Sequence, residues 1–277
     1  MSSLLYPCLW FDNNASEAAH FYVSLFKDAV ITDNNPIVTT FRVGEKTFMC
    51  LNGGPKFSFT AAISFFVYCK NVDETNALWN KLIQGGSTLM EINQYPWSER
   101  YGWLRDKYGL TWQISVVNPG EAESIRPSML FTGSVFGKAE EAMRFYTQTF
   151  KNSSITRLSH YPKEDANAGN VLYAEFQLNG YSAIAMDGPG EHAFKFNEAV
   201  SLVVPCQNQD EIDFYWDTLS KGGEESMCGW LKDKYGVSWQ VVPKILGDLM
   251  RDPKRSERVV QAFLKMKKFN IQALLDA

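Results

Sequence analysis

The chain has 277 residues, of which 45% are hydrophobic and 21% charged, and its formal net charge at pH 7 is −4. This size and apolar content suit one to three globular domains with cores of their own. Charges of both signs are mixed along the chain, which argues against a nucleic-acid-binding protein.

The same composition bears on the cellular compartment. The sequence contains no run of eighteen apolar residues, so no membrane-spanning helix and no membrane partner are expected. Its first residues lack the basic and apolar segments of a signal peptide. The five cysteines are odd in number and lack metal-binding spacing, which is typical of reduced thiols. We therefore expect a cytoplasmic protein.

The chain begins with a strand, a helix and three further strands. Residues 4–11 are compactly apolar, as in a buried strand. A helix is expected over 15–26, with Asn13 or Asn14 as its N-cap and with its apolar residues on one face. The next strands, the last two of which form a hairpin, are expected over 30–33, 38–43 and 46–51.

The same order then recurs. A strand over 62–69 precedes a helix over 72–84, which Gly85 and Gly86 end. Three more extended segments are expected over 88–95, 102–104 and 110–116. Each of these two stretches is a βαβββ unit.

A twelve-residue phrase shows that the pair of units is itself duplicated. Residues 102–113 read GWLRDKYGLTWQ, and residues 229–240 read GWLKDKYGVSWQ. Other matching sequence segments occur in the same order in both halves, as in a tandem repeat. We therefore expect an α+β fold of four βαβββ units. The halves differ in length mainly at 88–100 and 159–169, whose composition indicates loops.

Domain boundaries follow from the repeat. We predict a first domain over residues 1–120, a second over 127–244 and a helical tail over 245–277. Tail helices are expected at about 245–251 and 256–266, packed on a sheet edge or on a neighbouring chain.

Several segments resemble one known family. They are residues 9–22 (LWFDNNASEAAHFY), 52–57 (NGGPKF), 194–201 (FKFNEAVS) and the duplicated phrase. These words are similar to the PhnB-like branch of the vicinal oxygen chelate superfamily, which includes glyoxalase I, extradiol dioxygenases and the bleomycin and fosfomycin resistance proteins. The resemblance implies two glyoxalase/bleomycin-resistance-like domains, and the branch carries the label 3-demethylubiquinone-9 3-methyltransferase. The sequence shows no strand, glycine-rich turn and helix of the kind that seats S-adenosylmethionine.

The resemblance also implies where a metal would be held. Metal enzymes of the superfamily place His, Gln or Glu at four inner-sheet positions, and among the residues that fall there only Gln113 and Gln240 are ligands of this kind. A divalent ion needs several converging donors. We therefore predict no metal site and no cofactor, with a divalent metal disfavoured but not excluded. His20, His160 and His192 are expected on the surface or in loops.

Apolar and aromatic residues dominate the expected clefts. The residues predicted to line them are Trp10, Cys50, Trp103, Gln113, Met186, Trp230 and Gln240. Side chains alternate along a strand, so Trp112 should face away from Gln113 and pack against helices. The turn role is sufficient to explain the duplicated Asp106 and Asp233. No catalytic residue can be assigned.

These patterns favour a protein that binds a small apolar or aromatic molecule, without a tightly held metal and with Gln113 and Gln240 as polar anchors. The alternative is an enzyme: a metal-dependent isomerase, lyase or dioxygenase, or the methyltransferase of the family label. A third interpretation makes one repeat purely structural. The duplication is similar to the homodimer of a single-copy relative fused into one chain, which would keep the contacts of the dimer interface. A homodimer of this chain also stays open.

Overall fold

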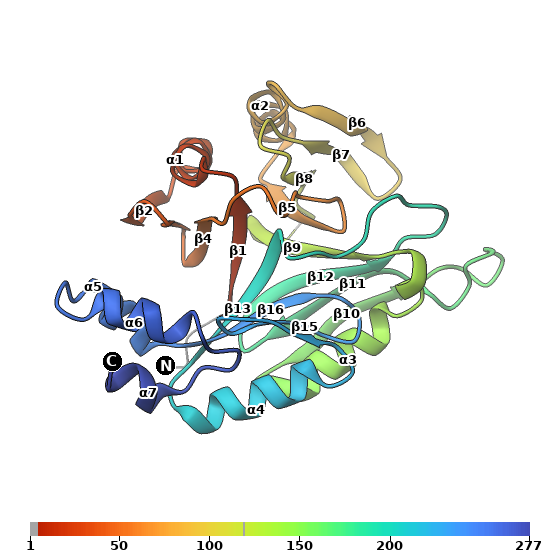
Figure 1. Cartoon of the computed structure of the whole chain (residues 1–277). Helices are drawn as coiled ribbons and strands as arrows, with labels where there is room; N and C mark the ends of the chain where they lie inside the picture. Colours follow the sequence, from red (N-terminus) through yellow and green to blue (C-terminus); the bar gives the residue numbers. More distant parts are fainter. Residues whose placement is uncertain (1–4, 119) are drawn as a thin grey trace.

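The computed structural model describes residues 5–118 and 120–277 (Figure 1). The first repeat consists of unit 1, with β1 (Tyr6–Phe11), α1 (Ala15–Leu25), β2 (Ala29–Asn34), β3 (Val38–Val43) and β4 (Lys46–Asn52), and unit 2, with β5 (Ile63–Cys69), α2 (Val72–Leu82), β6 (Ser87–Tyr95), β7 (Ser98–Arg105) and β8 (Thr111–Val116). The predicted βαβββ order is confirmed. Leu4, where the first predicted strand begins, lies outside the described residues.

The second repeat follows the same order. It consists of unit 3, with β9 (Ser124–Phe131), the 3-10 turn Gly133–Val135, α3 (Ala139–Thr149), β10 (Ser154–His160), β11 (Val171–Leu178) and β12 (Tyr181–Asp187), and unit 4, with β13 (Val200–Cys206), α4 (Gln209–Ser220), β14 (Glu224–Glu225), β15 (Trp230–Lys232) and β16 (Ser238–Pro243). The tail holds α5 (Ile245–Arg251), α6 (Ser256–Phe263) and α7 (Ile271–Leu275). The α+β fold of four units is confirmed, with a third short tail helix that the sequence did not predict.

Each sheet takes one unit from each repeat. Sheet A has the strand order β14-β15-β16-β13-β1-β4-β3-β2, so it joins unit 4 to unit 1. Sheet B has the order β10-β11-β12-β9-β5-β8-β7-β6, so it joins unit 3 to unit 2. At each centre two first strands pair antiparallel, with Cys8 opposite Ser201 in sheet A and Ser64 opposite Ser128 in sheet B. Each sheet, and with it each face, is therefore shared between the two repeats.

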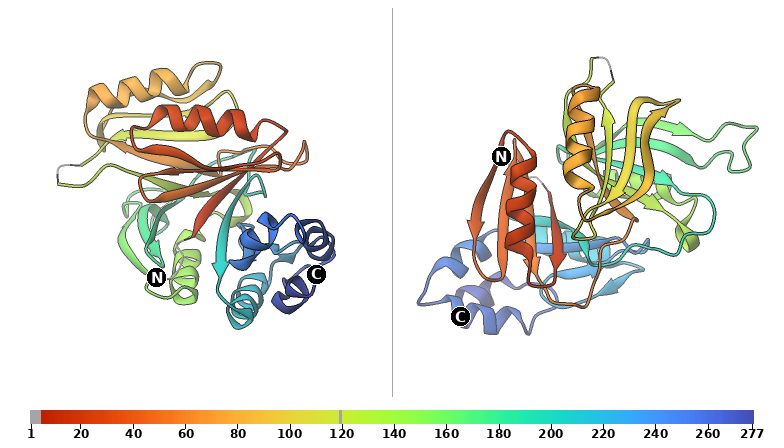
Figure 2. Two further views of the ribbon diagram at one scale, coloured as in Figure 1. Left: turned by 90° about the vertical axis from the view of Figure 1, so that its left-hand side faces the viewer. Right: turned by 90° about the horizontal axis from the view of Figure 1, so that it is seen from above.

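The helices cover one face of each sheet. Helices α1 and α2 of the first repeat lie on one side of the molecule, and α3 and α4 lie on the opposite side (Figure 2). We call the face of each sheet that its helices do not cover the inner face. Since side chains alternate along a strand, the parity of each strand decides which residues reach it.

A buried carboxylate links the two units of the first repeat. Asp106, which follows β7, accepts hydrogen bonds from the Tyr22 hydroxyl of α1 at 2.9 Å and from Trp112 Nε1 of β8 at 2.8 Å. It also accepts from the main-chain N–H groups of Tyr108 and Leu110. Burial raises the pKa of Asp106, and the four donors oppose this rise. The turn role predicted for Asp106 is therefore only part of its structural role.

The second repeat contains the same arrangement. Asp233 accepts from the Tyr146 hydroxyl at 2.6 Å and from Trp239 Nε1 at 2.9 Å. The duplicated phrase thus contains an acceptor, a tight turn and a tryptophan donor that together join a helix of one unit to a strand of the next.

The start of α1 is held differently from the prediction. Asn14 is the N-cap residue by position, but its side chain makes no capping hydrogen bond. The Ala15 N–H instead donates to Asn52 Oδ1 at 2.9 Å. Because Asn52 is distant in sequence, local sequence analysis could not identify this cap.

The tail packs on the edge of sheet A, beside α4 (Figure 1). The Cys228 and Gly229 N–H groups donate to the carbonyls of Met266 and Lys267. Phe269 lies against Gly229, where a Cβ atom would stand 2.6 Å from its ring. This agrees with the expected packing on a sheet edge. Within the described part of the chain, no helix is long and apolar enough to cross a bilayer.

Lys46 gives the fold a pH dependence. Its ammonium group donates to the Ile125 carbonyl of sheet B and lies 5.4 Å from the ring centre of Tyr181. Burial lowers the pKa of Lys46 from 10.5 to about 8, and the charge of Arg126 adds to this effect. Between these values the unfolded chain binds more protons than the folded one, so the free energy of unfolding should rise with pH.

We expect Lys46→Met to remove this rise. Urea unfolding of the parent protein and of Lys46→Met from about pH 7 to about pH 10 measures the change in the free energy of unfolding. The other titrating groups contribute equally in the two proteins, so the difference between the curves reports Lys46. Lys163→Met, at an exposed position, serves as the control. A Lys46→Met curve that rises as steeply as the parent curve would contradict this role.

Candidate functional site

The duplicated tryptophan and glutamine face opposite sides of their sheets. Trp112 packs under α1, with its ring centre 5.3 Å from that of Tyr22, and Trp239 packs against Tyr146 at 5.2 Å. The neighbouring Gln113 therefore reaches the inner face of sheet B, as predicted. Gln240 occupies the same place in sheet A.

A cleft of about 290 Å³ lies at the inner face of sheet A. Its volume is near the lower end of typical small-molecule sites. Trp10 of β1 and Trp230 of β15 meet across the face, with ring centres 5.8 Å apart and planes at 80°. Phe57 adds a second edge-to-face contact to Trp10 at 5.0 Å. The structure thus places the predicted Trp10 and Trp230 together on the wall of one cleft.

Charged groups line the other side of the cleft. Lys232 lies 3.4 Å from a carboxylate oxygen of Glu198 and 3.0 Å from one of Glu224. Ser238, the register partner of Lys232, also lines the cleft and is buried. The wall is therefore more polar than predicted, because the β14–β15 hairpin supplies Glu224 and Lys232 and the loop before β13 supplies Glu198.

Gln240 lies on the inner face but not on the cleft wall. Its Nε2 donates to Ser201 Oγ at 2.8 Å. Cys8 is register partner to Ser201, and burial raises the pKa of its thiol to about 12, which makes it a poor nucleophile. These three side chains form a satisfied polar layer on the inner face of sheet A.

Cys50 is on the opposite face. It pairs with Leu9, whose neighbour Cys8 points to the inner face, and it belongs to the core under the helices. Burial raises the pKa of its thiol well above the ordinary value. The placement of Cys50 on a cleft wall is therefore wrong, because neighbouring residues of a strand point to opposite faces and Cys50 lies on the helix-covered side of β4.

The inner face of sheet B is packed with its own side chains. Gln113 accepts from the Tyr101 hydroxyl at 2.7 Å and donates to Ser64 Oγ at 2.7 Å. Trp103 and Met186 pack against the buried cluster on this face, with Trp103 Nε1 buried and without a hydrogen-bond partner among the described residues. The predicted Trp103, Gln113 and Met186 are thus brought together, but as part of a packed layer.

The long hairpin β6–β7 explains this difference between the sheets. Tyr95 stacks on Trp97 at 4.9 Å, and both contact Tyr101. The additional residues predicted for the segment 88–100 therefore supply the rings that fill sheet B. In sheet A the corresponding strands, β14 and β15, are only two and three residues long.

A largely buried ion pair joins β9 and β11 of sheet B. Arg126 Nη1 donates to Glu175 Oε2 at 2.5 Å, with about 15% of each side chain exposed. Glu175 also accepts from the Tyr173 hydroxyl, which in turn lies 2.6 Å from the hydroxyl of Tyr68. These four side chains form one connected network, which links β5, β9 and β11 across this face of sheet B.

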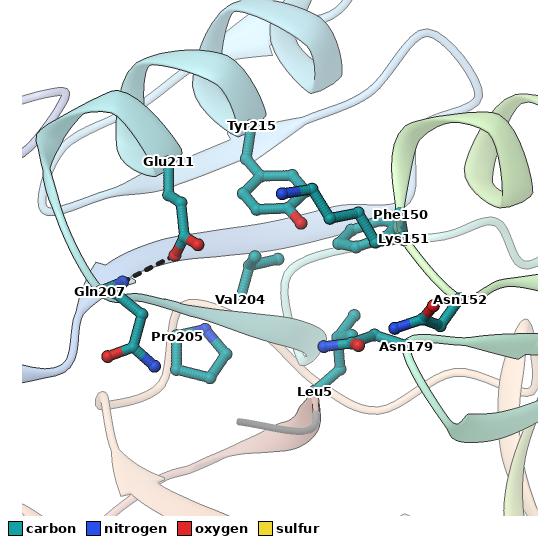
Figure 3. A pocket seen from close by; sticks show the side chains of 10 residues that line it. All are labelled: Leu5, Phe150, Lys151, Asn152, Asn179, Val204, Pro205, Gln207, Glu211 and Tyr215. Carbon is teal, nitrogen blue, oxygen red and sulfur yellow. Dashed lines mark hydrogen bonds between the residues drawn. The ribbon is translucent and has the colours of Figure 1, made fainter. Parts of the chain in front are cut away.

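A smaller cavity of about 80 Å³ lies between α4, β13 and the end of α3 (Figure 3). Glu211 points toward Gln207 and accepts a hydrogen bond from its N–H at 2.8 Å. Tyr215 of α4 and Lys151, which follows the end of α3, also lie at this cavity (Figure 3). This volume is far below that of typical ligand sites, so the cleft in sheet A is the candidate site.

Metal donors do not converge in the structure. Among residues 5–118 and 120–277, no group of three or more His, Cys, Asp and Glu side chains could hold an ion. His20 and His160 are exposed, and His192 lies 3.0 Å from the Pro189 carbonyl oxygen. The inner positions of sheet A hold Cys8, Ser201 and Gln240, which supply no carboxylate or imidazole.

Several residues of the cleft were not predicted from the sequence. They are Lys56, Phe57, Glu198, Glu224, Lys232 and Ser238. The repeat offered a signal for Ser238, because it is the counterpart of Thr111 in the duplicated phrase. Nothing local pointed to the glutamates.

Comparison with known proteins gives the following relations. The model of the 3-demethylubiquinone-9 3-methyltransferase family matches residues 3–115 and again 123–242. No curated protein sequence matches the chain. The solved structure of a putative 3-demethylubiquinone-9 3-methyltransferase, PhnB protein, from Bacillus cereus is 35% identical over 40% of this chain and 98% of its own, with a TM-score of 0.38.

Glyoxalase I from Zea mays is similar over 91% of this chain and 97% of its own, with a TM-score of 0.58 and 10% identity. At this identity the likeness shows the fold alone.

Proposed function

Because the chain belongs to the 3-demethylubiquinone-9 3-methyltransferase family, in the PhnB-like branch of the vicinal oxygen chelate superfamily, we propose a function from its cleft: the binding of a small aromatic or apolar molecule at the inner face of sheet A. The observation that carries this proposal is the pair Trp10 and Trp230 on the wall of a cleft of about 290 Å³. Aromatic walls supply large contact area and favour edge or face contact with a flat ligand.

The residues at the cleft do not fit a tightly bound divalent ion. Lys232 forms ion pairs with Glu198 and Glu224, and the inner layer offers a thiol of raised pKa, a hydroxyl and an amide. A protein site for a transition metal normally supplies about three or four imidazole, thiolate or carboxylate donors. We therefore propose binding without a tightly held metal, and we derive no reaction step through one.

The glycines after β4 do not fit a cofactor cradle either. A Cβ atom at Gly53 would stand 2.2 Å from the Trp10 ring, so glycine is needed there to admit Trp10. Trp10 Nε1 also donates to the Gly54 carbonyl at 2.7 Å. The Trp10 ring occupies the space over this turn, which gives S-adenosylmethionine no place there.

Paired substitutions in the two repeats test the site. Trp230→Ala should weaken binding of indole about tenfold or more, because it removes one aromatic wall of the cleft. Trp103→Ala, at the matching position in sheet B, should leave that affinity unchanged. Isothermal titration calorimetry measures both, and thermal unfolding confirms that each variant is folded.

Other outcomes would point elsewhere. Equal loss in both variants, or no loss in either, would remove the sheet A cleft as the binding site. A stoichiometric Fe, Mn, Ni or Zn in protein purified without chelator would favour the enzyme alternative instead.

A further inference from the structure

We infer that Ser238 is the polar anchor of the cleft and that the ligand carries a neutral hydrogen-bonding substituent, such as an N–H or O–H group, on its aromatic or apolar body. The inference rests on the proposed function, because it concerns the same cleft. It assigns to Ser238 a role in ligand specificity.

The Ser238 hydroxyl is a buried polar group at the cleft. The residue is 1% exposed, its side chain lines the cleft, and Oγ has no hydrogen-bond partner in the part of the chain that the structure describes. A buried hydroxyl without a partner costs free energy, so native proteins rarely keep one that serves nothing. A group entering the cleft can supply the missing hydrogen bond.

The first repeat provides an internal comparison. Thr111 occupies the same register position in sheet B, beside Ser64 as Ser238 is beside Ser201. Its Oγ1 donates to the Ile63 carbonyl at 3.3 Å. Where the inner face is packed, the hydroxyl thus bonds within the protein. In sheet A, where a cleft is present, the Ser238 hydroxyl has no partner among residues 5–118 and 120–277.

The surrounding charges favour a neutral substituent. Lys232 lies opposite Ser238 in the β15–β16 ladder, and Glu198 and Glu224 hold its ammonium group. An anionic substituent would meet the two carboxylates, and a cationic one would meet the ammonium group. A neutral donor or acceptor meets neither repulsion and can still bond to Ser238 Oγ.

Indole and indene test the inference, since they share a shape and differ in whether the five-membered ring carries an N–H. The parent protein should bind indole about tenfold more tightly than indene, as one hydrogen bond to a buried hydroxyl implies. Ser238→Ala should bring the ratio of the two dissociation constants close to one, mainly by weakening indole. The matched control Thr111→Val should keep the parent ratio. Isothermal titration calorimetry gives all six constants.

A ligand-free measurement supports the same test. Because Ser238 Oγ has no described partner, Ser238→Ala should leave the urea midpoint unchanged or raise it, whereas Thr111→Val should lower it. A midpoint that falls equally in both variants would make the Ser238 hydroxyl structural and overturn the inference. Equal dissociation constants for indole and indene in the parent protein would also overturn the inference, because the Ser238 hydroxyl would then make no hydrogen bond to the ligand. The proposed function would stand in that case. If neither compound binds, the proposed function fails, and this inference fails with it.

Discussion

Asp106→Ala should lower the free energy of unfolding by about 3 to 5 kcal/mol, the largest effect expected of a single substitution in this chain. The change removes the acceptor of both the Tyr22 hydroxyl and Trp112 Nε1, and both donors are buried. Two main-chain N–H groups of the turn lose their acceptor as well. Because Tyr22 and Trp112 belong to different units, the substitution removes hydrogen bonds that hold unit 1 against unit 2.

Urea unfolding measures this effect, and the repeat supplies a second case. Asp233→Ala should cost a similar amount, since Tyr146 and Trp239 lose the same acceptor. Asp33→Ala, on the exposed part of β2, should change stability by no more than about 0.5 kcal/mol. A loss at Asp106 as small as that at Asp33 would show that the buried donors find other acceptors.

Residues 1–120 produced alone should form a homodimer, although they make up a complete sequence repeat. In the full chain β1 pairs with β13 and β5 pairs with β9. Separation of the repeats therefore exposes one hydrogen-bonding edge of β1 and one of β5. Exposed edges of this kind seek new partners. Since β5 is the repeat counterpart of β13, β1 of one copy can pair with β5 of the other, and a closed two-fold dimer satisfies both edges.

Sedimentation equilibrium tests this prediction. The fragment should sediment with twice its own mass, and mixing it with a fragment of residues 121–277 during refolding should give a one-to-one complex instead. A folded monomer of residues 1–120 at micromolar concentration would contradict the prediction, because it would mean that each repeat closes its own sheet.

The sequence was informative wherever the evidence was local or repeated. Periodicity and turn residues located the strands and helices, and two copies of each pattern reinforced every assignment. The alternation of Trp112 and Gln113 predicted correctly which residue packs under α1. The pairing of β1 with β13 joins segments far apart in the chain, and no local pattern carries that information.

Errors at the site have similar causes. The resemblance placed Cys50 among the inner-sheet positions, and a shift of one residue along a strand moves a side chain to the opposite face. Glu224 lies on the short strand β14, and Glu198 comes from the loop before β13, so these two cleft residues meet at Lys232 through tertiary contacts that no local pattern carries. Trp10 and Trp230 could be predicted, since aromatic residues on inner-face parity were expected to line a cleft.

The crossing of the repeats between the sheets also limits how the duplicated chain could diverge. A repeat that drifted as a whole would alter both inner faces at once, because each face is built from one unit of each repeat. The faces differ instead where single hairpins differ: β6–β7 is long and aromatic, and β14–β15 is short and charged. Selection could therefore seal one face and keep the other accessible by lengthening one hairpin, without disturbing the shared central strands on which both depend.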